Sequence, residues 1–269
     1  MEPNKKRLFF GFEVIAPWPE KLPMGKLLDV HNRHITLAFL GTTDWNQLSQ
    51  ALTQFPIPPF KVGLAGKFDH CQFLPKRHSN VVAWHVEWID DVQMLLAYQK
   101  GFTQWLIQKG FSPSQPDRKW LPHVTLCRKP FNARLWNDTF VSLPMIFQNL
   151  HLYESLGNSK YQSIWHYPIL PPFEELDHIA DIAFMIYGES LQQIVTHAQI
   201  ALAFTFPPLL NYLEQVSELH SLEDIVIHLN SLISQTDKAI GCPFKAVSFH
   251  GDLVKRDDNT LQWEMIVDV

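Results

Sequence analysis

Runs of apolar residues separated by polar and proline-rich segments occupy the first 170 residues of the chain. Residues 7–14 (RLFFGFEV) and 34–40 (HITLAFL) predict two buried strands. The segment PWPEKLP between them is too rich in proline to continue a strand or a helix. Residues 41–44 (GTTD) are expected to close the second strand, and Asp44 is placed to cap a helix that follows.

A second group of patterns predicts paired strands and a helix. Residues 80–88 (NVVAWHVEW) carry an apolar residue at every second position from Val82 to Trp88, and residues 60–70 (FKVGLAGKFDH) predict the partner strand. Apolar side chains at intervals of three and four residues predict a helix over residues 91–109, ended by Gly110. The runs HVTLCR, IFQNLHLYES and YQSIWHYPI predict further strands, which favours an α+β unit over a regular βα alternation.

Two of the predicted strands share a motif. The sequence HITL begins at His34, and HVTL begins 89 positions later at His123. Because side chains two apart in a strand face the same way, each strand presents its histidine together with Thr36 or Thr125, and the residues between them face apolar layers. This repeat predicts that the unit consists of two related halves.

The repeated motif supplies the groups needed to open a cyclic phosphate. One imidazole can deprotonate water while the other protonates the departing ribose oxygen, and each threonine hydroxyl can bond a phosphate oxygen. Arg128 would add a cation, although its odd offset from His123 places it on the opposite face of a regular strand. A single His-x-Thr is usually an ordinary hydrogen-bonded histidine, but two copies in matching contexts favour catalysis.

The remaining histidines of this half lack partners at a useful spacing and are expected to be ordinary sheet or surface residues: His31, His70, His78, His85, His151 and His166.

The two parts of the chain differ in net charge, whereas the overall composition is ordinary. The apolar fraction of 46% and charged fraction of 18% are typical of globular proteins. Residues 1–170 hold 18 Lys and Arg against 12 Asp and Glu, a balance of +6, whereas residues 171–269 hold 4 against 15, a balance of −11. The basic part suits a polyanion such as RNA, and the acidic part suits a cation or a basic protein surface, unless the charges are merely scattered unevenly.

Several classes of protein are disfavoured by the same sequence. We find no run approaching the roughly 20 apolar residues of a membrane span, and no secretory signal at the N-terminus. The three cysteines are too few and too scattered for a disulfide framework or a structural zinc site. These features predict a cytoplasmic location and no membrane partner.

The acidic part has its own pattern. Residues 173–206 predict a strand, a turn and a helix, and residues 245–269 predict a final hairpin. Oxygen and nitrogen donors in these segments could bind a divalent cation, although such acids are more often simply solvated: Asp177, His178, Asp181, His250 and Asp268.

Residues 7–170 resemble the two-histidine phosphoesterase superfamily, and specifically its bacterial and archaeal RNA 2',3'-cyclic phosphodiesterases. The resemblance rests on RLFFGFEV, HITLAFLGTTD, VVAWHVEW, PHVTLCR and LHLYES. It implies a bilobal, pseudo-twofold α+β fold with antiparallel sheets, flanking helices and a groove. This sequence departs from the family between Arg7 and His34, where the short, proline-rich segment predicts that the expected helix is shortened. The resemblance also implies that His34 is the general acid and His123 the general base, that Thr36, Thr125 and Arg128 hold phosphate, and that no cofactor is needed.

Residues 173–206 and 245–269 are similar to archease, the small protein that activates the GTP-dependent RNA-splicing ligase. The similarity lies in DHIADIAFMIYGESL, in KAVSFH and in the terminal VDV. It implies a small α+β domain, shortened in its middle, in which Asp181, Asp268 and the carboxylate of Val269 bind Ca²⁺ or Mg²⁺.

We therefore predict a phosphodiesterase domain at residues 1–170 joined to an archease-like domain at residues 171–269. The expected function is hydrolysis of RNA 2',3'-cyclic phosphate ends to 2'-phosphates, linked to RNA ligation or tRNA processing. Two alternatives stay open: a non-catalytic protein that binds RNA ends as a ligase cofactor, and a metal-dependent hydrolase centred on the C-terminal acids.

Overall fold

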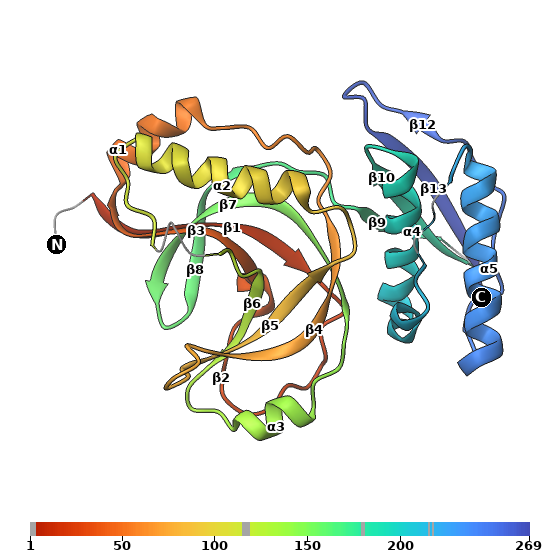
Figure 1. Ribbon diagram of the computed structural model, residues 1–269, viewed down its shortest axis with the longest axis horizontal. Coiled ribbons are helices and arrows are strands. Elements are labelled where there is room, and N and C mark those ends of the chain that lie inside the picture. Colours follow the sequence, from red (N-terminus) through yellow and green to blue (C-terminus); the bar gives the residue numbers. More distant parts are fainter. Residues whose placement is uncertain (1–3, 115–118, 179–180, 215, 217) are drawn as a thin grey trace.

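The protein contains two antiparallel sheets with helices packed against them (Figure 1). The computed structural model describes residues 4–114, 119–178, 181–214, 216 and 218–269. Within these residues the first sheet has eight strands and the second has five. The mixed α and β composition and the antiparallel pairing agree with the fold class expected from the sequence.

The strands of the first sheet pair in a closed circuit. Their order is β1-β3-β6-β5-β4-β7, and β7 also pairs with β1; β2 adds to β6 and β8 adds to β7. These strands are β1 (Lys5–Ile15), β2 (Lys26–Leu27), β3 (His34–Asp44), β4 (Ala65–Leu74), β5 (Val81–Trp88), β6 (His123–Arg128), β7 (Pro144–Gly157) and β8 (Lys160–Tyr167). Between β1 and β3, residues 16–33 hold β2 and the 3-10 turn η1 (Val30–Asn32) but no α-helix.

Strand β3 is longer than its pattern predicts. Residues 41–44 do not close it but remain in the strand, because the start of β1 pairs with them, from Lys5 opposite Asp44 to Leu8 opposite Gly41. The prediction for Asp44 itself is confirmed, since its carboxylate accepts hydrogen bonds from two backbone amides at the start of α1 (Trp45–Ala51).

The predicted helix is α2 (Gln93–Gln108), which lies with α1 along one side of the sheet (Figure 1). Its buried residues include Leu95, Phe102 and Leu106, but Met94 points to solvent, so the apolar stripe is narrower than the sequence suggests. Gly110, at φ +87°, follows the helix as predicted. The remaining short elements of this part are η2 (Leu52–Gln54) and α3 (Ala133–Asp138).

The second sheet has the order β11-β13-β10-β9, with β12 paired to β13. Its elements are β9 (Phe173–Leu176), β10 (Ile182–Gly188), α4 (Leu191–Thr205), η3 (Pro207–Asn211), α5 (Leu222–Ile240), β11 (Ala246–Val247), β12 (Val254–Lys255) and β13 (Leu261–Asp268). Helix α5 begins with a capping box formed by Ser221 and Asp224. None of the helices in the described residues is both long and apolar enough to cross a membrane.

Seven consecutive residues of helix α4, from His197 to Ala203, are buried because the helix packs against both sheets. Buried apolar residues of the described chain gather in two clusters, one drawn from residues 8–169 and one from residues 173–267. The second cluster also includes Ala65 of β4 and Ile146 of β7. Ile146 faces away from its neighbours Met145 and Phe147, which belong to the first cluster. Helix α4 therefore packs against the outer side of the first sheet.

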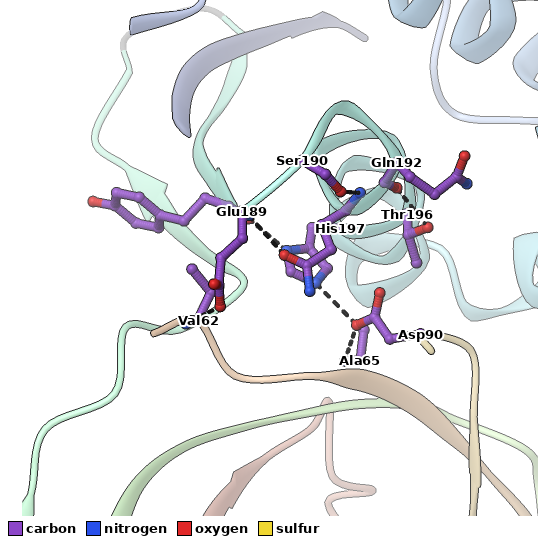
Figure 2. Close-up of polar contacts among 10 residues, drawn as sticks. Val62, Ala65, Asp90, Glu189, Ser190, Gln192, Thr196 and His197 are labelled. Atoms are coloured by element: carbon purple, nitrogen blue, oxygen red, sulfur yellow. Dashed lines mark hydrogen bonds and ion pairs between the residues drawn. The ribbon is translucent and has the colours of Figure 1, made fainter. Parts of the chain in front are cut away.

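A buried ion pair joins α4 to the first sheet (Figure 2). The Nε2 atom of His197 lies 2.9 Å from Oδ2 of Asp90, and its Nδ1 atom lies 2.5 Å from the carbonyl oxygen of Tyr187. The same Asp90 oxygen accepts a hydrogen bond of 2.6 Å from the backbone amide of Ala65. Both ring nitrogens thus face acceptors, which requires the doubly protonated imidazolium. Burial opposes the charge, but the carboxylate of Asp90 outweighs it and raises the pKa of His197.

A second contact joins the segment that precedes β4 to Glu189, the residue just before the start of α4. Oε1 of Glu189 accepts hydrogen bonds from the backbone amides of Lys61, at 2.7 Å, and Val62, at 3.5 Å. Figure 2 shows Val62 beside Glu189. The side chain of Lys61 donates to the backbone oxygen of Asp258. The chain entering β4 is therefore held by residues from the second half of the sequence.

We expect Asp90→Ala to destabilise the protein by about 3 kcal/mol or more, because it leaves the buried His197 and the amide of Ala65 without their partner. Denaturant unfolding of the full chain measures this loss. Glu87→Gln is the matched control, since its exposed pairing with Lys67 is worth below about 1 kcal/mol. Equal effects of the two substitutions would contradict the assigned ion pair.

The same pair gives a pH dependence with a defined sign. Because the folded pKa of His197 is raised, its contribution to stability is complete below the unfolded value of about 6.5 and is lost as pH rises through the folded pKa. The decrease in the free energy of unfolding as the pH rises above about 6.5 should therefore be smaller in Asp90→Ala than in the unmodified protein.

Candidate active site

The two histidine motifs lie on neighbouring strands. Ile35 of β3 pairs with Val124 of β6 in antiparallel register. Continuing this register places His34 opposite Thr125 and Thr36 opposite His123, with all four side chains on the face away from the buried Ile35 and Val124. Diagonal neighbours in such a pair are about 7–8 Å apart, which leaves room for one phosphate between the two imidazoles.

The same irregularity follows both motifs. In the pairing of β3 with β1, Leu37 has no partner, because Phe10 pairs with Ala38 and Gly11 pairs with Thr36. In the pairing of β6 with β5, Leu126 is skipped in the same way between Thr125 and Cys127. The two leucines are equivalent positions of the motifs, so a local two-fold relation extends from the sequence to the backbone.

The bulge at Leu126 decides where Arg128 points. A bulge directs two consecutive side chains to one side, and both Leu126 and Cys127 are fully buried. Arg128 therefore emerges on the same face as His123, and its Nη2 atom lies 3.3 Å from the hydroxyl oxygen of Tyr161. The opposite face, which a regular strand would predict, is wrong for this residue.

Both catalytic candidates are held by the same kind of hydrogen bond. Nδ1 of His34 lies 2.7 Å from the carbonyl oxygen of Asn32, and Nδ1 of His123 lies 2.8 Å from that of Leu121. A carbonyl oxygen only accepts, so Nδ1 carries a proton in each ring. Acid or base chemistry at either histidine would therefore involve Nε2.

The surroundings of His34 are aromatic. Its ring centroid lies 4.6 Å from that of Phe9 and 5.3 Å from those of Tyr153 and Tyr161, and only 9% of the residue is exposed. This burial lowers the pKa of His34 to about 4; the bond to Asn32 acts in the other direction, and the nearby charges of the second motif add to the lowering. His34 is therefore neutral at pH 7. The two histidines also differ in burial, because His34 is buried and His123 is only partly buried.

Gly11 lies in close contact with the His34 ring. A Cβ atom at Gly11 would lie 3.2 Å from Cδ2 of His34 and 3.0 Å from the carbonyl oxygen of Ile35. Sequence patterns gave no reason to select this glycine, because the contact depends on the pairing of β1 with β3.

A cavity of about 1360 Å³ opens beside the motifs. Thr36 and His123 line it, and two lysines, Lys76 and Lys119, contribute positive charge. Trp120 also lines it and donates from Nε1 to the carbonyl oxygen of Thr36 at 2.9 Å, which ties the wall of the cavity to the first motif. An anionic, flat ligand suits this combination.

Several histidines expected to lack partners have them in three dimensions. Nδ1 of His85 lies 2.7 Å from Asp69, and Nδ1 of His151 lies 2.8 Å from the hydroxyl of Ser163. Nε2 of His151 lies 3.6 Å from Oε2 of Glu13, and together with hydrogen bonds from the amides of Gln148 and Asn149 this imidazole lowers the pKa of Glu13 to about 2. These partners come from adjacent strands, so no spacing along the chain could reveal them.

The predicted metal ligands of the acidic part lie at one end of the second sheet. Ile182 pairs with Val267, and continuing this register places Asp181 opposite Asp268. Their oxygens are suitable donors for Ca²⁺ or Mg²⁺. The ammonium of Lys245 already donates to the terminal oxygen of Val269 at 2.5 Å, so a cation would have to share that carboxylate. Ile179 and Ala180 of the archease-like motif lie outside the described residues.

Comparisons with known proteins match the chain to solved structures but to no family model. No protein-family model and no curated protein matches the chain. Among solved structures, E. coli LigT complexed with 3'-AMP is 20% identical over 61% of this chain and 98% of its own, with a TM-score of 0.45. The protein TT0787 of Thermus thermophilus is 17% identical over 61% and 97%, also with a TM-score of 0.45. Similarity of this extent does not define the family or the activity of this chain.

We expect an NMR titration of the full chain to give His34 a pKa of about 4, the lowering being caused by its aromatic surroundings. Tyr161→Ala should expose the ring and raise this pKa toward the ordinary value of about 6.5. Tyr161→Phe, which keeps the ring and removes only the hydroxyl, is the control and should leave it low. A midpoint near 6.5 in the unmodified protein would refute the assigned burial.

Proposed function

We propose that this chain is a metal-independent phosphodiesterase that opens 2',3'-cyclic phosphates at RNA ends and leaves 2'-phosphates. The observation that carries the proposal is the pairing of Ile35 with Val124, because it sets two His-x-Thr motifs side by side in antiparallel register. Two imidazoles and two hydroxyls around one point are what in-line displacement at phosphorus needs.

In this proposal the cyclic phosphate lies over the exposed face of the two paired strands, between the two imidazoles. The hydroxyls of Thr36 and Thr125 donate to its non-bridging oxygens, and the guanidinium of Arg128 balances its negative charge. Arg128 is available for this role because the bulge at Leu126 turns it toward the motif face.

The different surroundings of the two histidines suggest which is the base. His34 is neutral at pH 7, so its Nε2 atom accepts the proton of the attacking water as the new bond from oxygen to phosphorus forms. In this role His123 must carry a proton on both nitrogens, and it donates its Nε2 proton to the ribose 3'-oxygen as the bond from that oxygen to phosphorus breaks. The products are a 2'-phosphate and a 3'-hydroxyl. This assignment reverses the roles that the family resemblance implies.

The cavity beside the motifs supports RNA as the substrate. Lys76, Lys119 and Trp120 extend the site beyond the reacting phosphate, and a lysine-lined groove with an aromatic wall suits the backbone and base of an adjoining nucleotide. The balance of +6 over residues 1–170 favours the same ligand.

We expect His34→Ala and His123→Ala each to lower the turnover of a 2',3'-cyclic-phosphate oligonucleotide by about 10²–10⁴-fold, because each removes one proton-transfer group. The exposed His31→Ala is the matched control and should retain full activity. Turnover should also persist in EDTA.

Other outcomes identify the alternatives. Binding of cyclic-phosphate RNA without turnover by the unmodified chain would favour a non-catalytic RNA-end protein. Turnover that EDTA abolishes, and that Asp268→Asn removes, would favour a hydrolase centred on the C-terminal acids.

A substrate with sulfur in place of the 3'-bridging oxygen separates the two histidine roles. A thiolate leaves without a general acid, so this substrate should restore most of the activity of His123→Ala but little of that of His34→Ala. The reverse pattern of rescue would assign the acid to His34.

We also propose that the acidic part links this activity to RNA ligation. Its charge of −11 and the adjacent Asp181 and Asp268 support an archease-like contact with the GTP-dependent RNA-splicing ligase. That ligase uses 2',3'-cyclic-phosphate or 3'-phosphate ends, so forming 2'-phosphates would withdraw its substrate.

If this link exists, the full-length chain should bind the ligase or change its rate of guanylylation, and Asp181→Asn with Asp268→Asn should reduce the effect. His123→Ala is the control, because it should leave the interaction intact. A chain that neither binds the ligase nor alters guanylylation has no such partnership.

A further inference from the structure

A bulge in β4 gathers three metal-binding side chains on one face. Phe68 pairs with Val86 and His70 pairs with His85, so Asp69 between them has no partner on β5. Because a bulge directs two consecutive side chains to one side, Asp69 and His70 both face away from the core, toward His85.

The three side chains are in direct contact. Oδ1 of Asp69 lies 2.7 Å from Nδ1 of His85, and Oδ2 lies 3.0 Å from Nδ1 of His70. The two imidazole rings stack with centroids 4.7 Å apart and planes inclined by 27°. One donor atom from each residue lies within 4.8 Å of the other two, and no other group of three such residues in the described chain has this spacing.

Two of these residues lie in the wall of the cavity that Thr36 and His123 also line. His70 and His85 both line that cavity, and His85 pairs directly with His123 across β5 and β6. Paired residues of adjacent strands have side chains on the same side, so the three-residue group and His123 share one face.

We propose that Asp69, His70 and His85 bind one divalent transition-metal ion of the zinc type. Two imidazoles and one carboxylate form a three-ligand set that leaves a fourth tetrahedral position open, and nitrogen donors favour such ions over Mg²⁺ or Ca²⁺. Bonds of about 2.1 Å require donors roughly 3–3.5 Å apart. The carboxylate already lies close to each ring, so mainly the two imidazoles must approach each other.

The exposure of both rings allows the side-chain rotations that this closure needs. The side chain of His70 is 51% exposed and that of His85 is 23% exposed, so neither ring is locked in a packed interior. In the metal-free protein, Asp69 accepts from both Nδ1 atoms. Metal binding at Nδ1 requires each ring to give up that proton or to carry it on Nε2.

The open coordination position would hold an oxygen ligand in the cavity. If the cavity binds RNA, which rests on the proposed function, this ligand is a phosphate oxygen adjoining the reacting end. Ring opening at the two motif histidines does not use the ion, so metal binding and hydrolysis are separate properties with separate tests.

Titration of the EDTA-treated, dialysed full chain with Zn²⁺, followed by calorimetry, should show one saturable ion per chain. His70→Ala and His85→Ala should each weaken this binding by more than about 100-fold, which exceeds the effect of losing an outer-shell partner. Co²⁺ should give visible absorption bands that the same substitutions remove. His78→Ala, an exposed histidine in the turn of the same hairpin, is the matched control and should bind normally.

Two results would overturn the proposal. One is the absence of saturable Zn²⁺ binding by the unmodified chain, whether or not that chain hydrolyses cyclic phosphates. The other is binding that survives in both His70→Ala and His85→Ala but is lost in Asp268→Asn, which would place the ion in the second sheet. Circular dichroism of each variant verifies that it is folded.

Discussion

The antiparallel contact between β3 and β6 is the constraint on which the candidate site depends. It consists of a single assigned residue pair, Ile35 with Val124, yet it fixes the register of both motifs. A slip of one residue in either strand would turn its histidine into the core and expose its β-branched residue. The burial of Ile35 and Val124 in the first cluster opposes such a slip, so packing on one face determines the chemistry available on the other.

Equivalent motifs do not have equivalent surroundings. The backbone around His34 and His123 follows the same plan, including the Nδ1 hydrogen bond to the carbonyl two residues earlier. The halves differ in burial, because His34 is buried beside Phe9 and Tyr161, whereas His123 is only partly buried. A difference in desolvation can thus separate the proton affinities of two groups that the sequence presents as alike.

Sequence periodicity predicted the strands and helix α2 because each depends on a local alternation of buried and exposed positions. The side chains that complete the site were harder to foresee, since their placement depends on backbone irregularities and on neighbouring strands. Arg128 needs a skipped residue in β6, Gly11 needs contact across β1 and β3, and His70 meets His85 only through a bulge. A pattern of fixed period cannot encode an interruption of that period.

Strand β4 connects two parts of the molecule that the sequence separates widely. Its first residue, Ala65, is held by the carboxylate that pairs with His197 of α4, and His70 stands five residues further along, about 17 Å in an extended chain. Helix α4 cannot slide against the first sheet without either breaking that anchor or pulling on the strand that forms the groove wall. A force applied to α4 would therefore be transmitted along the continuous backbone of β4 to the wall of the cavity.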